Sequence, residues 1–282
     1  MKAHRFYEQF LINRKHRFIY CFVPKVACSS LKRWFVRVAG IPPESVVPEV
    51  HLFVAENFSL ARLPEREAEE LLRSKDYYRF AFQRNPFARL VSAYLDKLVE
   101  PKGPGLAPIR RVQRGPLWDV PRRIRYEFRR LTTGRCADFQ QGITFREFVY
   151  HVASSTSPRR LDTHWRPQSL ILGDVQFDFI GLMETMRPDF DHVCQQLGLD
   201  SDLPLTNCNR KSKTDAPTGC VADWPTSQLR ELDSYPPFER FYTPELTKIV
   251  QRLYRHDCAA FERLSQRSRC RKSGVERTAE AA

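Results

Sequence analysis

The stretch RFIYCFVPKVACSSLKRW, residues 17–34, decides the fold. Residues 17–23 are short, aromatic and β-branched, which is typical of a buried strand. After the loop PKVACSS at residues 24–30, apolar side chains recur at the i, i+3, i+4 and i+7 spacing of a helix. These side chains are Leu31, Trp34, Phe35 and Val38. A strand, a tight loop and a helix together form the repeating unit of a parallel sheet.

The same pattern returns later in the chain. Residues 78–82 (YRFAF) predict a second strand, QRN a turn, and residues 86–99 a helix with Pro86 at its favoured first position. Two such units predict an α/β fold with a central parallel sheet flanked by helices. Because such sheets bind ligands outside the carboxyl ends of their strands, we expect both loops at one functional edge. We expect Ser29 or Ser30 to cap the first helix.

The remaining patterns predict one domain with an inserted segment. Further strands are expected at residues 45–51 and 177–182, and further helices at residues 65–75, 144–152, 188–197 and 244–264. We assign residues 1–264 to a single domain, in which residues 100–130 form an arginine-rich insertion or flap. The polar residues 265–282 are expected to form a disordered tail.

Composition narrows the classes of partner. The chain has 282 residues, and the 42% that are hydrophobic suffice for a folded core. Lys and Arg number 46 against 33 Asp and Glu, and the net charge of +13 favours nucleic acid, anionic lipid, acidic polysaccharide or a phosphate-rich cofactor. No run approaches the roughly 18 to 20 apolar residues of a membrane span, so we expect no transmembrane segment. The eight cysteines lack ligand spacing, which disfavours zinc and favours free thiols.

The loop at residues 24–30 has the chemistry of an anion site. A loop between a strand and a helix N-terminus presents backbone N–H groups and the positive end of the helix dipole. This loop adds Lys25, two serine hydroxyls and small residues that let a ligand approach. The string lacks the glycines and the terminal GK[ST] of a nucleoside triphosphate loop, which disfavours a nucleotide kinase. The alternative is a solvated lysine beside serines that cap the helix.

Residues 17–34 resemble the 5′-phosphosulfate loop of the carbohydrate sulfotransferases of the chondroitin and dermatan type, whose pattern is close to YC(Y/F)VPKV(G/A)C(T/S)xxK. Residues 80–98, FAFQRNPFARLVSAYLDKL, resemble the 3′-phosphate element FxFVRxPFxRLxSAYxxK of the same family. The strings HWRPQ at residues 164–168 and FDFIGLMET at residues 177–185 resemble later segments of that family. Four motifs in this order span more than half of the chain, which is far more specific than one loop.

The resemblance implies a fold related to P-loop kinases and the sulfuryl donor 3′-phosphoadenosine 5′-phosphosulfate, called PAPS. It implies Lys25 beside the 5′-phosphate and the transferring sulfuryl group, and Arg84 and Ser92 at the 3′-phosphate. The full donor-binding set that it implies is Pro24, Lys25, Val26, Ala27, Cys28, Ser29, Ser30, Arg84 and Ser92. The chain departs from the family pattern at Ala27, where glycine is common, and at Gln83, where valine is usual.

Sulfuryl transfer needs charge stabilised on the departing phosphate and a proton acceptor for the attacked hydroxyl. Lys25 is the candidate for the charge, and His51 and His164 are candidates for the base because histidine titrates near neutral pH. We prefer His51, which ends the predicted strand at residues 45–51 and would emerge at the active edge. Either histidine is otherwise a packing residue, and Glu184 either orients a base or sugar or is an ordinary helix-start acid. The mechanism needs no metal.

The acceptor is expected to be a glycan, and an acidic one. Eight arginines crowd one segment: Arg110, Arg111, Arg114, Arg122, Arg123, Arg125, Arg129 and Arg130. Because like charges repel unless an anion is nearby, we expect Arg122, Arg123 and Arg125 to bind an acidic or sulfated glycan. Trp165 and Arg166 are further candidates for substrate contact. The alternative is a solvated basic surface.

Two other functions compete with PAPS-dependent transfer to a glycan hydroxyl. A basic nucleic-acid-binding protein would suit the charge but leaves both phosphate loops unexplained, so we expect no nucleic acid partner. A non-catalytic module that binds PAPS or a nucleotide fits the same loops. Most family members of this type are Golgi enzymes with an N-terminal membrane anchor. We therefore expect the Golgi lumen if the chain is an excised catalytic domain, and the cytoplasm or a membrane surface if it is full length.

Overall fold

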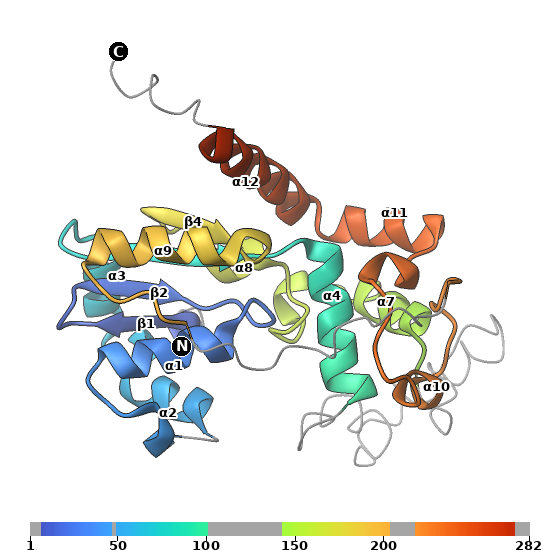
Figure 1. Ribbon diagram of the computed structural model, residues 1–282, viewed down its shortest axis with the longest axis horizontal. Helices are drawn as coiled ribbons and strands as arrows, with labels where there is room; N and C mark the ends of the chain where they lie inside the picture. The colour runs from blue at the N-terminus through green and yellow to red at the C-terminus, as the bar shows by residue number, and fades with distance from the viewer. Residues whose placement is uncertain (1–6, 47–48, 101–142, 204–217, 274–282) are drawn as a thin grey trace. The chain divides into compact units, whose positions relative to one another are not determined.

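The computed structural model describes residues 7–46, 49–100, 143–203 and 218–273. The chain divides into two compact units, each built from discontinuous segments (Figure 1). The first unit comprises Met1–Pro86, Asp162–Cys208 and Tyr254–Ala282, and the second comprises Phe87–Leu161 and Asn209–Leu253. The chain leaves the first unit after Pro86 and returns to it twice. The single domain expected over residues 1–264 stays a prediction.

A four-stranded sheet forms the centre of the first unit (Figure 1). Its strands are β1 (Phe10–Asn13), β2 (Phe18–Cys21), β3 (Tyr78–Gln83) and β4 (Phe179–Leu182), in that spatial order. Strands β2, β3 and β4 are parallel, as the strand-loop-helix units predict. Strand β1 was not predicted, because its short buried run FLIN lies between charged stretches, and it pairs with β2 antiparallel. The sheet is therefore mostly parallel rather than wholly so.

Helices flank this sheet on both faces. They are α1 (Cys28–Val38), α2 (Val50–Asn57), α3 (Glu65–Arg73), α8 (Gln168–Leu172), α9 (Met186–Leu197) and α12 (Arg255–Ser273). On one face the Trp34 ring of α1 packs against Phe80 of β3 and Phe190 of α9, with ring centroids 6.3 and 5.1 Å apart. Arg79 of β3, which alternation turns to the other face, donates to the Leu72 carbonyl of α3 at 3.0 Å. The predicted arrangement of helices around the sheet is thus confirmed.

The strand predicted at residues 45–51 is wrong. The structure has a 3₁₀ turn at Pro43–Val46 and helix α2 from Val50 to Asn57. The buried side chains of α2 are Val50 and Val54, one helical turn apart, so packing follows the i, i+4 spacing and overrides the strand propensity of valine. His51 consequently lies in the first turn of a helix rather than at the end of a strand.

The C-terminal helix predicted at residues 244–264 is two helices, α11 (Pro244–Leu253) and α12. The helix is interrupted at Tyr254, whose hydroxyl donates to the Trp165 carbonyl at 2.5 Å. Helix α12 continues to Ser273, past residue 265, where the tail was expected to begin. The break coincides with the boundary between the two units.

The second unit is helical over its described residues. It contains α4 (Pro86–Tyr94), which starts at Pro86 as predicted and runs into a π-helical turn at Leu95–Val99. Its other α-helices are α7 (Phe145–Ala153), α10 (Thr226–Arg230) and α11. The Tyr94 ring packs against Phe145 and Phe148 of α7 with ring centroids 5.3 and 5.6 Å apart. This aromatic cluster is the core on which α4 and α7 meet.

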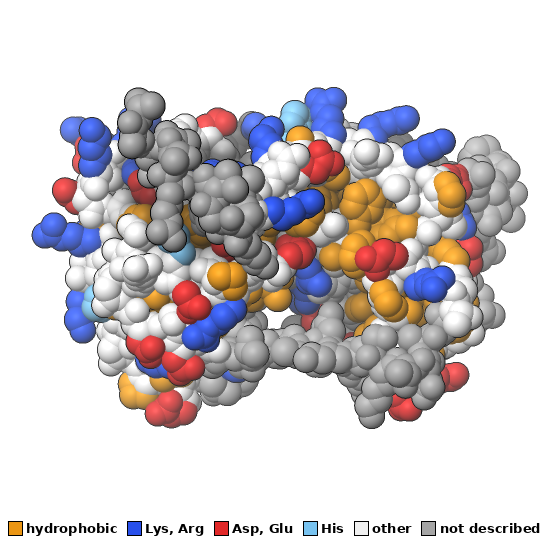
Figure 2. Space-filling view, turned by 45° about the horizontal axis from the view of Figure 1, so that its top comes forward, with side chains coloured by type: hydrophobic (Ala, Val, Ile, Leu, Met, Phe, Trp, Pro, Cys, Tyr) orange, Lys and Arg blue, Asp and Glu red, His pale blue; other side chains and the backbone are white. Residues whose placement is uncertain are grey.

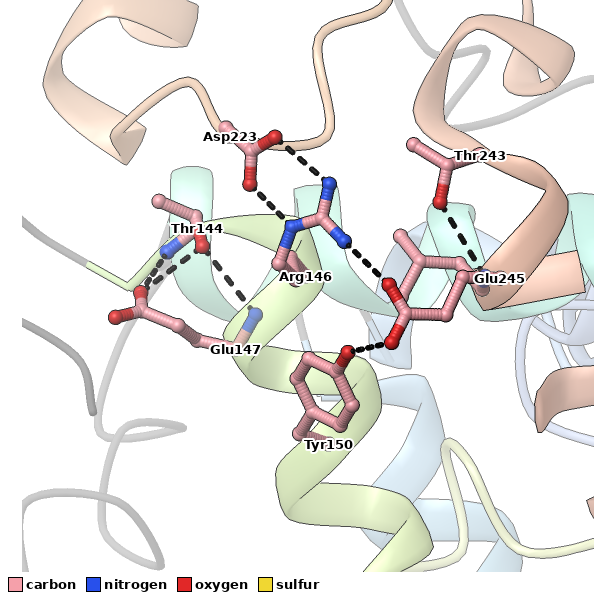
Figure 3. A network of polar contacts seen from close by, with 8 residues as sticks. Thr144, Arg146, Glu147, Tyr150, Asp223, Thr243 and Glu245 are labelled. Atoms are coloured by element: carbon pink, nitrogen blue, oxygen red, sulfur yellow. Dashed lines mark hydrogen bonds and ion pairs between the residues drawn. The ribbon is translucent and has the colours of Figure 1, made fainter. Parts of the chain in front are cut away.

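Polar contacts around Arg146 tie three segments of the second unit together (Figure 3). The Arg146 guanidinium donates to both carboxylate oxygens of Asp223, at 2.5 and 2.8 Å, and to Glu245 at 3.2 Å. Glu245 also accepts a hydrogen bond from the Tyr150 hydroxyl at 2.5 Å. Hydrogen bonding to Asp223 raises the pKa of Arg146, so the guanidinium of Arg146 stays protonated within the network.

Candidate active site

The loop between β2 and α1 has a strained backbone at two residues that are not glycine. Lys25 has φ 70° and Ala27 has φ 47°, and both values lie in the left-handed region. For a residue with a Cβ this region costs roughly 1–2 kcal/mol. The buried side chains of Val23 and Val26 flank Lys25, and the Val26 N–H donates to the Val23 carbonyl at 3.2 Å. Strain that is held by such packing is typical of functional loops.

Helix α1 begins at Cys28, and the residue at its N-cap is Ala27, which makes no side-chain cap. The prediction that Ser29 or Ser30 caps the helix is therefore wrong, because both serines lie inside the first turn. The alanine carbonyl accepts from the Leu31 N–H at 3.0 Å, which closes that turn. The positive end of the helix dipole thus lies directly after the strained loop, as an anion site requires.

Arg84 joins the second loop to the first. It follows β3, and its guanidinium donates to the Lys25 carbonyl at 3.1 Å. Since β2 and β3 are parallel neighbours, their carboxyl ends bring the two loops to one edge, as predicted. Burial lowers the pKa of Arg84, and the charge of Glu184 opposes this shift. A largely desolvated guanidinium beside the strained loop is well suited to bind phosphate.

The backbone of Arg84 is held by a residue that was not predicted, Gln168. The fully buried Gln168 amide accepts from the Arg84 N–H at 3.0 Å and donates to the Arg84 carbonyl at 2.8 Å. The buried Asp257 carboxylate of α12 in turn accepts from the backbone N–H groups of Gln168 and Ser169, at 2.6 and 2.9 Å. Gln168 is the last residue of the string HWRPQ, so this contact gives the string a structural role.

Glu184 also contacts the second loop. It lies in the 3₁₀ turn Met183–Thr185 after β4, and its carboxylate accepts from the Asn85 N–H at 2.9 Å. Strand β4 is the parallel neighbour of β3, so the loops after both strands meet at the same edge as the first. Glu184 therefore supports the loop that carries Arg84.

His51 lies beside the N-terminus of α1. Its Nε2 is 3.0 Å from the Ser29 hydroxyl, and its Nδ1 is 3.1 Å from the Lys32 ammonium nitrogen. Lys32 was not predicted as a site residue, although it is the final lysine of the motif VPKVxCxxxK. It is 3% exposed, and burial lowers its pKa to about 8 while Cys28 opposes the shift. The structure thus brings His51 to the first loop even though the predicted strand is absent.

The contacts described above do not include the other predicted residues, some of which lie outside the described part of the chain. His164 pairs with Asp162, its Nδ1 2.6 Å from the carboxylate. Trp165 is buried at 5% exposure and Arg166 is half-buried. Ser92 is a buried residue of α4 and belongs to the second unit. The predicted acceptor-binding residues Arg122, Arg123 and Arg125 lie outside the described residues.

Comparison with known proteins identifies the family of the chain. The family model described as Sulfotransferase family matches residues 8–262, so the chain belongs to this family. It is 31% identical over 195 residues to carbohydrate sulfotransferase 14 of Danio rerio, covering 68% of this chain and 48% of the relative. It is 26% identical over 227 residues to human carbohydrate sulfotransferase 9, covering 77% of this chain and 47% of the relative. The resemblance to carbohydrate sulfotransferases is confirmed.

The chain spans about half the length of these curated relatives. No solved structure matches it. Among the described residues, no helix combines the length and the apolar composition needed to cross a membrane. Within the same residues, no group of three or more His, Cys, Asp and Glu side chains is placed to hold a metal ion. That the reaction needs no metal stays a prediction.

Proposed function

We propose that this chain transfers a sulfuryl group from PAPS to a hydroxyl group of a glycan, on a fold related to P-loop kinases. The observation that carries the proposal is the hydrogen bond between Arg84 and the Lys25 carbonyl. It joins the strained loop at the start of α1 to the loop after β3, and these are the two segments whose motifs resemble the donor-binding elements of the family. Family membership supports the reaction class.

The residues of the first unit divide the work between binding and chemistry. PAPS supplies the activated sulfuryl group. The strained loop and the first turn of α1, residues 24–30, hold the 5′-phosphate, and Lys25 stabilises the charge that develops on it. Arg84 holds the second phosphate, a role in which Ser92 stays a prediction from the family motif. His51 accepts the proton of the acceptor hydroxyl.

The acceptor is proposed to be an acidic glycan, from the arginines between residues 110 and 130. The described surface in Figure 2 carries lysine and arginine side chains spread among acidic ones. His164, Trp165 and Arg166 stay candidates for acceptor contact. The resemblance to carbohydrate sulfotransferases, which the relatives' names support, favours the Golgi lumen over the cytoplasm.

Binding of adenosine 3′,5′-bisphosphate tests the donor. Because the two loops offer separate phosphate sites, this compound should bind at least about tenfold more tightly than AMP, which is a difference of about 1.4 kcal/mol. It should also bind more tightly than ATP, whose phosphates all lie on the 5′ side. Isothermal titration calorimetry measures all three affinities. Equal or better binding of ATP would contradict the proposal.

The Gln168 contact predicts a variant that weakens donor binding without touching the donor. In Gln168→Leu the two hydrogen bonds to the Arg84 backbone are lost, so the guanidinium is no longer held in place. We expect the dissociation constant for adenosine 3′,5′-bisphosphate to rise about tenfold or more, corresponding to one or two hydrogen bonds of about 1 kcal/mol. Calorimetry measures the change.

The exposed Gln195 of α9 offers a matched control, because Gln195→Leu makes the same chemical change in the same unit. This variant should bind as the wild type does. Circular dichroism checks that Gln168→Leu stays folded. A folded Gln168→Leu protein with wild-type affinity would show that Gln168 does not position Arg84.

A further inference from the structure

One helix holds both nitrogens of the His51 ring. Ser29 and Lys32 are three residues apart on α1 and therefore share a face of it. The Ser29 hydroxyl lies 3.0 Å from Nε2, and the Lys32 Nζ lies 3.1 Å from Nδ1. The ring is thus fixed in orientation, and each nitrogen has a defined neighbour. What remains to be set is which nitrogen carries the proton.

Lys32 is an unusual neighbour for a histidine because its amine is buried without a carboxylate. Its Nζ lies 3.4 Å from the centroid of the Phe22 ring, and the residue is 3% exposed. Within the described part of the chain no acidic side chain forms an ion pair with it; the groups that face it are Phe22, His51 of α2 and the Cys28 thiol of its own helix. Burial therefore lowers the pKa of Lys32 to about 8, which makes the neutral amine accessible near physiological pH.

The charge of Lys32 limits which tautomers of His51 are compatible with the contact at Nδ1. An ammonium group can only donate, so Nδ1 must accept from it and the ring hydrogen resides on Nε2. In that state Nε2 cannot take a proton from a hydroxyl. A neutral amine can also accept, so Nδ1 can carry the hydrogen and donate it to Lys32, and the Nε2 lone pair then faces the Ser29 hydroxyl on α1 and can take a proton.

We propose that Lys32 is a positioning residue that sets the tautomer of His51, and that the base-competent ring is the one paired with a neutral Lys32. The role of base rests on the proposed function. As the acceptor oxygen attacks, its proton moves to Nε2 and the Nδ1 proton moves to the Lys32 amine. The imidazole ends neutral and the positive charge ends on the lysine, so no imidazolium has to persist in the site.

Nitrogen-15 NMR of the histidine rings tests the tautomer without any donor. The chain has 7 histidines, and the His51 signals are those missing from His51→Ala. In the wild type, His51 should change from the Nε2–H to the Nδ1–H form as the pH rises through about 8, where Lys32 loses its proton. In Lys32→Arg, which stays protonated, His51 should keep Nε2–H throughout. In Lys32→Met, the step near pH 8 should vanish.

Activity gives a second measure. Wild-type kcat/KM should rise as Lys32 loses its proton. In Lys32→Met, kcat/KM should fall about 10- to 100-fold and show no step at that pH. In Lys32→Arg, kcat/KM should fall about 10²- to 10⁴-fold. Lys75→Met, the same change at an exposed lysine of the first unit, should behave as the wild type does. A His51 ring that follows the wild-type tautomer in both Lys32 variants would overturn the proposal, whatever the donor proves to be. Failure of the donor test with an intact tautomer switch would instead remove only the proposed reaction.

Discussion

Lys25→Ala should lower kcat by about 10²- to 10³-fold, the cost of removing one group that stabilises charge in a transition state. Lys25 lies in the strained loop at the positive end of α1, where the leaving phosphate is proposed to bind. Charge builds up on that phosphate only as the bond to sulfur breaks, so the lysine contributes more in the transition state than in the bound ground state. Steady-state kinetics should show the loss mainly in kcat, with little change in the donor KM.

Arg84→Ala should behave in the opposite way and chiefly raise the donor KM, because the second phosphate keeps its charge throughout the reaction. The exposed Lys75 provides a control, since Lys75→Ala removes the same charge from the same unit. Normal turnover in a folded Lys25→Ala protein would show that Lys25 does not stabilise charge on the leaving phosphate. A loss of kcat in Arg84→Ala equal to that in Lys25→Ala would contradict the division of roles between the two residues.

The parts of the site that could be predicted are those encoded by local pattern. The run of buried residues at 18–21, followed by helical spacing from Leu31 to Val38, is decided within one stretch of chain. The same holds for β3 and α4. Two such units place their loops at one edge by the rules of parallel sheets, which is why the contact of Arg84 with the first loop could be anticipated.

The parts that could not be predicted depend on contacts between distant segments. Gln168 meets Arg84 across 84 residues, and Asp257 reaches Gln168 across a further 89. The spacing of apolar residues along the sequence gives no information about contacts between such distant residues. The strand predicted at residues 45–51 was wrong for a related reason. Valines favour a strand locally, but burial of Val50 and Val54 on one helical face favours helix α2 instead. His51 nevertheless lies beside the first loop, because its ring on α2 contacts Ser29 and Lys32 of α1.

Lys32 shows what a finer reading of the motif would have found. It stands three residues after Ser29, so helical spacing alone places both on one face of α1. Leu31 and Trp34 mark the adjacent buried face of that helix, and a lysine so close to them must either pair with an acid or lose its proton easily. Among the described residues no acidic side chain pairs with Lys32. Its lowered pKa shows instead that it loses its proton easily.

His51→Ala should reduce kcat/KM by about 10²- to 10⁴-fold, the usual contribution of a general base, and should abolish the limb of the pH-rate profile that depends on the imidazole. The reason is its position: the ring lies 3.0 Å from Ser29 in the first turn of α1, next to the loop proposed to hold the reacting phosphate. His164, by contrast, is held by Asp162 at 2.6 Å, so His164→Ala should lose less than His51→Ala. The exposed His256 of α12 supplies the matched control. A fully active His51→Ala beside an inactive His164→Ala that still folds and binds adenosine 3′,5′-bisphosphate would transfer the role of base to His164.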